Sequence, residues 1–191
     1  MKKSVVRKIV VAGVLSAVAA FLGLTRLGYI PWFSGASLTV MHVPAIVGAV
    51  LEGPVVGAVI GLVFGLTSLL QAAIAPTGPL DPAFVNPLIS VLPRLLVGPA
   101  AFLAYAAFRG KLEIPALGLS GIVGSLVNTM LVVGALALFG FLTWDLFWPI
   151  VTANGLPEAG AAAIVNVAVV AAWKGVARRG GKASIAAEED R

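Results

Sequence analysis

Long apolar runs alternate with short polar or proline- and glycine-rich segments along most of this chain. A helix that crosses a membrane needs about 20 mostly apolar residues. Within these runs, apolar and polar residues do not alternate at every second position, so the runs predict helices and not the strands of a membrane barrel. The pattern predicts an all-α membrane protein with six transmembrane helices, at about residues 4–24, 39–51, 55–75, 84–108, 116–141 and 158–176.

Basic residues predict how these helices are oriented. Of the 13 Lys and Arg residues, only Arg26 and Arg94 lie away from the chain ends and the 109–115 loop. Because Lys and Arg concentrate in cytoplasmic segments, six spans place the N- and C-termini in the cytoplasm and the protein in the cell membrane. Tryptophans favour the membrane interfaces, and this topology puts Trp32, Trp144 and Trp148 at the outer one and Trp173 at the inner one.

The predicted spans form one unit. We expect a single integral membrane domain over residues 1–177, with a retained first span and not a cleaved signal peptide. The polar residues 178–191 form a cytoplasmic tail that we expect to be disordered. The long apolar runs between short connections leave no place for a second domain.

Composition supports a membrane protein and excludes several functions. Hydrophobic residues make up 60% of the chain and charged residues 11%, which is too few to coat a soluble domain. With no Cys and one His, we expect no disulfide, no zinc site and no cofactor. The absence of a Walker A motif argues against ATP hydrolysis, and the basic residues at span ends suit anionic lipid better than nucleic acid.

Arg94 is the first candidate binding residue. It lies about ten residues into the fourth predicted span, or ~15 Å along a helix. A cation at that depth costs about 2.5–3.5 kcal/mol, so it should face a cavity or a partner. Pro93 and Pro99 leave the carbonyls of Ile89 and Leu95 without their helical donors. Arg94 therefore either binds a ligand or caps these carbonyls.

Polar residues on the last two spans are predicted to share the depth of Arg94. Asn128 and Thr129 lie near the middle of the fifth span and Asn166 near that of the sixth. Together they predict a pocket that opens to the outside, although buried Asn residues also join helices by hydrogen bonds. Asn86, His42 and Glu158 could line its mouth. His42 could equally be a satisfied interfacial side chain, and Glu158 the N-terminal acid of its helix.

Small residues four positions apart form ridges on two predicted spans. Such a ridge lets another helix backbone approach closely, either within the protein or in a partner subunit. The third span carries Gly57, Gly61 and Gly65. The first span carries Gly13 and Ala17 on one face and Ala12, Ser16 and Ala20 on a neighbouring face.

Two blocks of the chain resemble a transporter family. The segment from Met41 to Pro54, with Gly57-Ala58-x-x-Gly61 after it, is similar to the S-components of energy-coupling factor (ECF) vitamin transporters. So is the stretch from Pro87 to Gly98. With the six-span layout, the resemblance covers about residues 4–177 and is strongest to the pantothenate-type S-components.

The resemblance implies an importer subunit that is not an enzyme. Members capture a vitamin at the outer face, dock on a transmembrane coupling subunit with two cytosolic ATPases, and topple in the bilayer to release it. Their docking surface is a small-x-x-x-small pattern on the first span, which Gly13 and Ala17 match best. Because Gly replaces Ala at the first position, Ala12, Ser16 and Ala20 remain candidates.

A pantothenate ligand fits the predicted polar residues. Arg94 can pair with its carboxylate, and Asn128 and Asn166 suit its hydroxyl and amide groups. Folate would need aromatic stacking and thiamine would need carboxylates. The alternatives are an S-component for folate, pyridoxine or a thiamine-related vitamin, a small membrane scaffold without a solute, and, least supported, a membrane hydrolase that uses His42.

Overall fold

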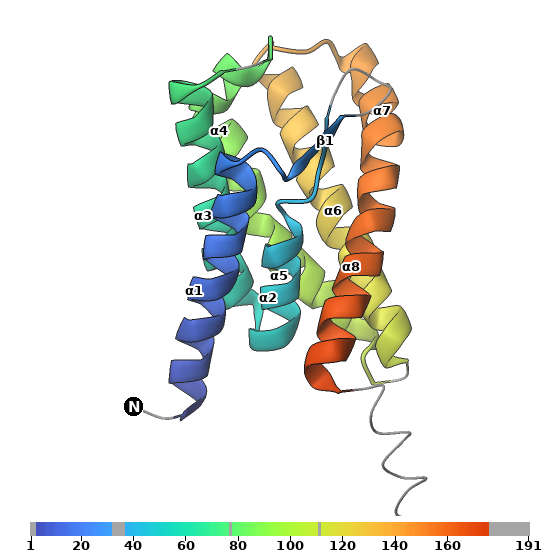
Figure 1. Cartoon of the computed structure of the whole chain (residues 1–191). Helices are drawn as coiled ribbons and strands as arrows, with labels where there is room; N and C mark the ends of the chain where they lie inside the picture. Colours follow the sequence, from blue (N-terminus) through green and yellow to red (C-terminus); the bar gives the residue numbers. More distant parts are fainter. Residues whose placement is uncertain (1–2, 32–36, 77, 111, 176–191) are drawn as a thin grey trace, which may run out of the picture.

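The computed structural model describes residues 3–31, 37–76, 78–110 and 112–175, which form a helical bundle (Figure 1). Within these residues, five helical segments are long and apolar enough to cross a membrane: Val5–Leu24, Pro54–Ile74, Pro87–Phe108, Glu113–Leu138 and Trp144–Lys174. The predicted helical membrane fold is therefore confirmed for five spans. The long helices are α1 (Lys3–Leu24), α3 (Pro54–Ile74), α5 (Leu92–Phe108), α6 (Glu113–Leu138) and α8 (Leu156–Lys174).

The second predicted span is a short helix inside the bundle. Helix α2 (Val43–Glu52) has 10 residues and is ~15 Å long, half the thickness of a bilayer core. Its residues from Val43 to Val50 are all buried, and they pack into the main apolar core with residues of α3, α5, α6 and α8. The apolar pattern predicted a membrane span here because a helix enclosed by protein is apolar on every side, as a span is.

The glycine ridge of α3 packs inside the molecule. A Cβ atom added at Gly61 would overlap the Arg94 carbonyl oxygen, and one at Gly65 would lie 2.8 Å from the Val91 Cα. At Gly57 the added atom would lie 2.9 Å from the Cα of Gly98. The ridge therefore lets α3 touch the backbone of α5, and its role is internal packing and not contact with another subunit.

The fourth predicted span is interrupted near its N-terminal end. It consists of a 3-10 turn η1 (Asp81–Val85), the short helix α4 (Pro87–Ser90) and then α5. Asn86 caps α4 by accepting a hydrogen bond from the Leu88 amide at 3.0 Å. The Ser90 hydroxyl donates to the Phe84 carbonyl, so a side-chain hydrogen bond links α4 to η1 across the interruption. This irregular backbone leads directly into the turn that carries Arg94.

The predicted loop before the last span is helical. A 3-10 turn η2 (Trp144–Leu146), the helix α7 (Phe147–Ile150) and a π-helical turn η3 (Val151–Gly155) lead continuously into α8. The prediction of a loop at residues 144–157 was wrong, because prolines at the first turn of a helix do not interrupt it. The helical segment thus begins 14 residues, or ~21 Å of helix, before the predicted start of the last span.

A small hairpin was not predicted. Strands β1 (Tyr29–Pro31) and β2 (Ser37–Thr39) pair antiparallel, with Tyr29 opposite Thr39. Figure 1 shows the hairpin in the upper part of the bundle, in front of α6 and beside α8. Three-residue strands are too short to give an alternating pattern that the sequence could reveal. Trp32 lies between the strands, outside the described residues.

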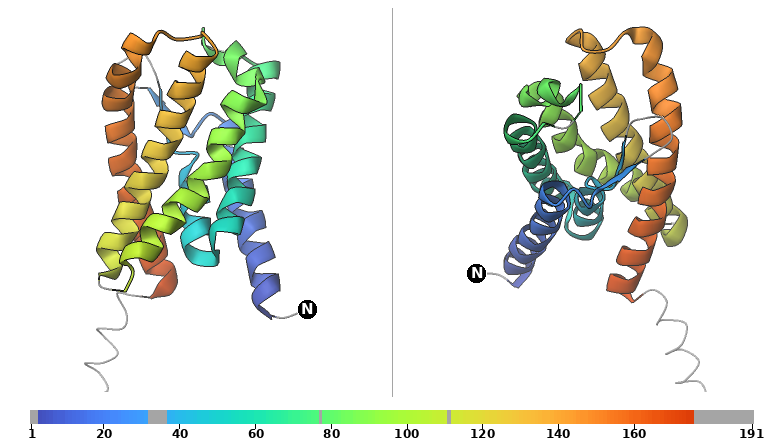
Figure 2. Two further views of the ribbon diagram at one scale, coloured as in Figure 1. Left: turned by 180° about the vertical axis from the view of Figure 1, so that it is seen from behind. Right: turned by 45° about the horizontal axis from the view of Figure 1, so that its top comes forward.

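The start of α1 and the end of α8 lie at the same end of the bundle (Figure 2). At this end Arg7 pairs with Glu52 at 2.7 Å, and Lys174 pairs with Glu113 at 3.1 Å. The Lys174 ammonium also donates to the Tyr105 hydroxyl at 2.6 Å, which joins α5, α6 and α8. The predicted tail at residues 178–191 and Lys111 lie outside the described residues.

Candidate functional site

A cavity with many polar lining residues lies between η1, α5, α6 and the segment that leads into α8. Its volume is about 570 Å³, within the range of small-molecule sites. Apolar side chains such as Val132, Leu136 and Ile150 form much of its wall. The polar side chains that line it are Thr39, Asp81, Arg94, Asn128, Thr129, Asn154 and Glu158.

Arg94 lies at the centre of the site. Its side chain is only 6% exposed, and its Nη1 donates to the Ile89 carbonyl at 2.5 Å. The guanidinium carbon lies 5.4 Å from the ring centre of Phe64 and 5.1 Å from that of Phe84. Arg94 therefore caps the carbonyl freed by Pro93, as one of the two sequence-based interpretations expected, and it also lines the cavity. Its role in binding a ligand stays a prediction.

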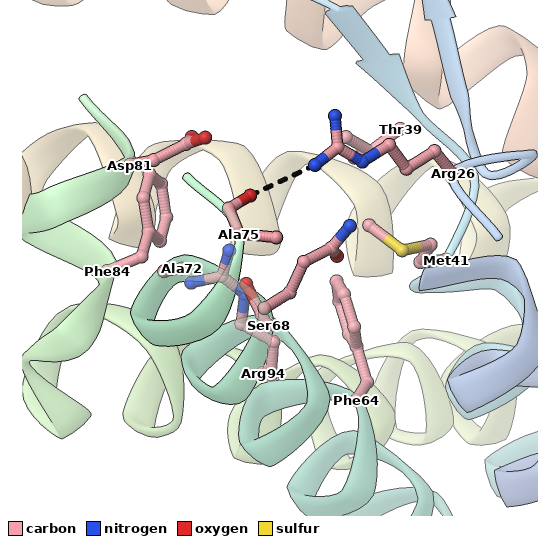
Figure 3. A pocket seen from close by; sticks show the side chains of 11 residues that line it. Arg26, Thr39, Met41, Phe64, Ser68, Ala72, Ala75, Asp81, Phe84 and Arg94 are labelled. Carbon is pink, nitrogen blue, oxygen red and sulfur yellow. Dashed lines mark hydrogen bonds between the residues drawn. The ribbon is translucent and has the colours of Figure 1, made fainter. Parts of the chain in front are cut away.

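A second cavity of about 250 Å³ meets the first at Arg94. It lies between α3, η1 and the chain between α1 and α2, and Figure 3 shows its side chains. Both cavities are lined by Thr39, Asp81, Phe84 and Arg94, so they are neighbouring chambers of one site. Arg26, Ser68 and Gln71 line only the smaller chamber.

A network centred on Glu158 forms the wall opposite α5. The Glu158 carboxylate accepts from the Thr39 amide at 2.6 Å and from the Thr129 hydroxyl at 3.0 Å. The Thr39 hydroxyl reaches the same carboxylate at 3.2 Å. These bonds tie strand β2 to α6 and α8. Beside them, the Asn128 Oδ1 atom is buried and has no hydrogen-bond partner within the described part of the chain.

Glu158 lies deeper than the sequence suggested. Its side chain is 6% exposed and part of the chamber wall, not of the mouth. The helical segment from Trp144 onward places about 14 residues, or ~21 Å of helix, before it. Glu158 was expected near the surface because residues 144–157 were expected to form a loop.

The structure does not bring Asn166 to the site. Its side-chain amide donates to the Leu117 carbonyl at 2.8 Å and to the Ser120 hydroxyl at 2.9 Å, and it lines neither chamber. Because Glu158 pairs with Thr129, residue 166 lies about eight residues, or ~12 Å, further along α8. Asn166 joins α8 to α6, which is the alternative that its sequence context left open.

Asn86 and His42 also lie outside both chambers. Asn86 caps α4, as described above. His42 is fully buried at the start of α2, where its carbonyl accepts from the Ala45 amide at 3.1 Å. Neither ring nitrogen of His42 has a partner among the described residues. The expectation that these two residues line the mouth is not met, because one is a helix cap and the other is in the core.

Several lining residues had no signal in the sequence. Thr39 reaches the site through the unpredicted hairpin, and Asn154 through the unpredicted π-helical turn. Asp81 and Phe84 come from the turn η1. Asp81 was expected in the connection before the fourth predicted span, and Phe84 as the first residue of that span. Arg26 is one of only two basic residues away from the chain ends and the 109–115 loop, and this isolated position is a sequence signal for a candidate site residue.

The comparison with protein families agrees with this architecture. Residues 7–170 match the family model described as "ECF transporter, substrate-specific component". The match covers most of the chain. The chain belongs to the ECF substrate-specific component family. A search of curated proteins finds no match.

Membership fixes the general role of this substrate-specific component. The family is a family of transporter subunits and not of enzymes, and its members associate with a transmembrane and ATPase module and take a small-molecule substrate. The five apolar spans agree with a multi-pass membrane protein. The chambers around Arg94 are the candidate site for the substrate.

The two small-residue faces of α1 differ in how exposed they are on this substrate-specific component. Gly13 and Ala17 are exposed, and a Cβ atom added at Gly13 would meet nothing within 4 Å. Ala12, Ser16 and Ala20 are half-buried instead, and Ala12 packs against the core. Gly13 and Ala17 are therefore the more accessible of the two candidate docking faces.

Proposed function

We propose that this substrate-specific component captures pantothenate, a water-soluble vitamin, at the outer face of the cell membrane. The observation that carries the proposal is the position of the buried Arg94 guanidinium, which lines both chambers of the site. A charge-assisted hydrogen bond between a guanidinium and a carboxylate is strong in a site that excludes water. Pantothenate has one carboxylate, which Arg94 can bind.

The rest of the larger chamber suits the other groups of pantothenate. Asn128 can both donate and accept hydrogen bonds, as the amide and hydroxyl groups of the vitamin require. Val132, Leu136 and Ile150 offer apolar surface to its two methyl groups. The chamber volume of about 570 Å³ leaves room for a molecule of this size.

A thiamine-related vitamin is the second candidate. Its cation would need carboxylates, which the sequence pattern did not predict at this depth. The structure brings Glu158 and Asp81 to the wall of the larger chamber. Folate has less support, because Phe64 and Phe84 lie against the Arg94 guanidinium and not against each other as a stacking clamp.

The remaining part of the proposal concerns delivery. We expect the end of the bundle with Arg7 and Lys174 to face the cytoplasm, with both termini on that side. Gly13 and Ala17 would form the surface that docks on the transmembrane coupling subunit, which two cytosolic ATPases drive. The vitamin would then be released on the cytoplasmic side.

Binding measurements on the purified protein test the proposal. Isothermal titration calorimetry should detect pantothenate binding to the wild type, and Arg94→Ala should weaken it about tenfold or more through loss of the charge-assisted bond. Arg109→Ala, an exposed arginine outside both chambers, is the matched control and should bind normally.

Other results would redirect the assignment. Thiamine binding that Glu158→Gln weakens, with no pantothenate binding, would select the second candidate. Equal pantothenate affinity in Arg94→Ala and wild type would remove Arg94 from the site. If no water-soluble vitamin raises the melting temperature of the purified protein, a scaffold role without a solute would replace the transport proposal.

A further inference from the structure

Arg26 contributes a second cation to the smaller chamber. It follows the end of α1, is exposed, and lines this chamber together with Arg94. Figure 3 shows the two guanidinium groups on different sides of the Ala75 carbonyl. Arg94 belongs to both chambers, whereas Arg26 belongs only to the smaller one. The smaller chamber is therefore lined by one exposed cation, Arg26, and one buried cation, Arg94.

The backbone of Arg26 adopts a conformation that disfavours a side chain. Its φ is +61°, and it is the only non-glycine residue with a positive φ in the described part of the chain. A position just after a helix end with this geometry is usually Gly, because Gly has no Cβ to clash. Replacing Arg26 by Gly should therefore relieve strain, which makes the residue useful for a test of side-chain function.

The side chain of Arg26 is held at the chamber. Its Nη2 donates to the carbonyl of Ala75, the residue that follows α3, at 2.9 Å. A guanidinium has five N–H donors, and this bond uses one of them. Asp81 also lines the chamber and accepts from the Gly78 amide at 2.8 Å, so the charged side chains of the wall are two cations and one carboxylate.

We propose that the smaller chamber is the entrance for an anionic solute and that Arg26 draws the solute toward Arg94. This inference rests on the proposed function, because it takes the solute to be an anion. Exposed charges chiefly change association rates, with a strong dependence on salt, whereas a buried charge partner chiefly changes dissociation rates. Arg26 and Arg94 should therefore act on different kinetic steps.

Stopped-flow binding of pantothenate to the purified protein separates these steps. At low ionic strength, Arg26→Gln should slow association roughly three- to tenfold, and this loss should shrink at high salt as screening removes steering in the wild type. Dissociation should stay within about twofold. Arg26→Lys should keep most of the wild-type association rate, and Arg94→Gln should mainly speed dissociation.

A purely structural role of Arg26 predicts a different result. If Arg26 only holds the end of α3, Arg26→Gly should lower the melting temperature, and association should not respond to salt differently from the wild type. In our proposal Arg26→Gly keeps the wild-type melting temperature or raises it, and still slows association as Arg26→Gln does. Arg109→Gln, outside both chambers, is the charge-matched control for the kinetics.

The outcomes separate this inference from the function on which it rests. An unchanged association rate in Arg26→Gln, with normal wild-type binding and a weakened Arg94→Gln, overturns the entrance and leaves the proposed function standing. No binding of pantothenate to the wild type overturns both. Faster association of thiamine after Arg26→Gln would show that the chamber repels the true solute, and would also overturn the inference.

Discussion

At the scale of single residues, burial and bonding separate polar groups that look alike in the sequence. Asn128 and Asn166 both interrupt apolar helices and were predicted to share one site. Asn166 has two hydrogen bonds to α6, whereas Asn128 lines the larger chamber, and its buried Oδ1 atom has no hydrogen-bond partner among the described residues. The same residue type thus joins helices in one place and lines a cavity in the other.

This difference predicts opposite effects of one substitution. Asn166→Leu should destabilise the protein by about 1–3 kcal/mol, because it removes the two buried hydrogen bonds that the Asn166 amide donates to the Leu117 carbonyl and the Ser120 hydroxyl. It should leave pantothenate affinity nearly unchanged. Asn128→Leu should weaken binding with a smaller loss of stability. Thermal unfolding and calorimetry measure the two effects. A large affinity loss in Asn166→Leu with normal stability would contradict this assignment.

At the scale of elements, glycine positions set how closely the helices meet. Gly61 lies against the backbone of Arg94. The contact between α3 and α5 therefore also sets the backbone position from which the Arg94 side chain extends into the site. Gly13 and Gly160 lie on outer faces, where an added Cβ would meet nothing within 4 Å. Identical small residues therefore act as internal spacers in α3 and as open surface in α1 and α8.

Gly61→Ala should disturb both stability and binding. The added methyl group would push α5 away and cost about 1–3 kcal/mol, and the shift of Arg94 should weaken pantothenate binding. Gly160→Ala is the matched control, and it should be neutral or slightly stabilising since Ala favours helices. Normal binding by a stable Gly61→Ala protein would show that α5 can move without affecting the site.

The outer face of α1 predicts a defect that appears only in the complete transporter. Gly13→Leu or Ala17→Leu should leave pantothenate binding intact, because neither side chain reaches the core, but should stop uptake in cells by blocking close approach of a partner helix. Gly160→Leu makes the same change on α8 and should preserve uptake. Loss of binding in Gly13→Leu would assign this face to internal packing instead.

At the scale of the whole molecule, the sequence predicted the bundle better than the site. The long helices follow from apolar runs, which burial in lipid requires regardless of tertiary detail. The chambers depend on irregular backbone: the hairpin that supplies Thr39, the turn η1 that supplies Phe84, and the π-helical turn that supplies Asn154. These short segments have no periodicity, so only packing in three dimensions reveals them.

The position of Arg94 shows the same limit. Its depth and the two prolines predicted a buried cation with a free carbonyl nearby, and the bond to Ile89 agrees with this. The depths of Glu158 and Asn166 were misplaced because the start of the last helix was set at a proline that did not begin it. An error of one helix boundary moved both residues by about eight positions, or roughly two turns, relative to α6.

The short helix α2 fills one part of the bundle with buried apolar side chains. Both chambers border Arg94, while α2 fills the part of the bundle nearer the described chain ends with tightly packed apolar side chains. A solute at Arg94 therefore faces a permeability barrier and not a pore. Liposomes that contain this protein alone should retain trapped radiolabelled pantothenate as well as protein-free liposomes do, and faster leakage would show that the barrier can open without a partner.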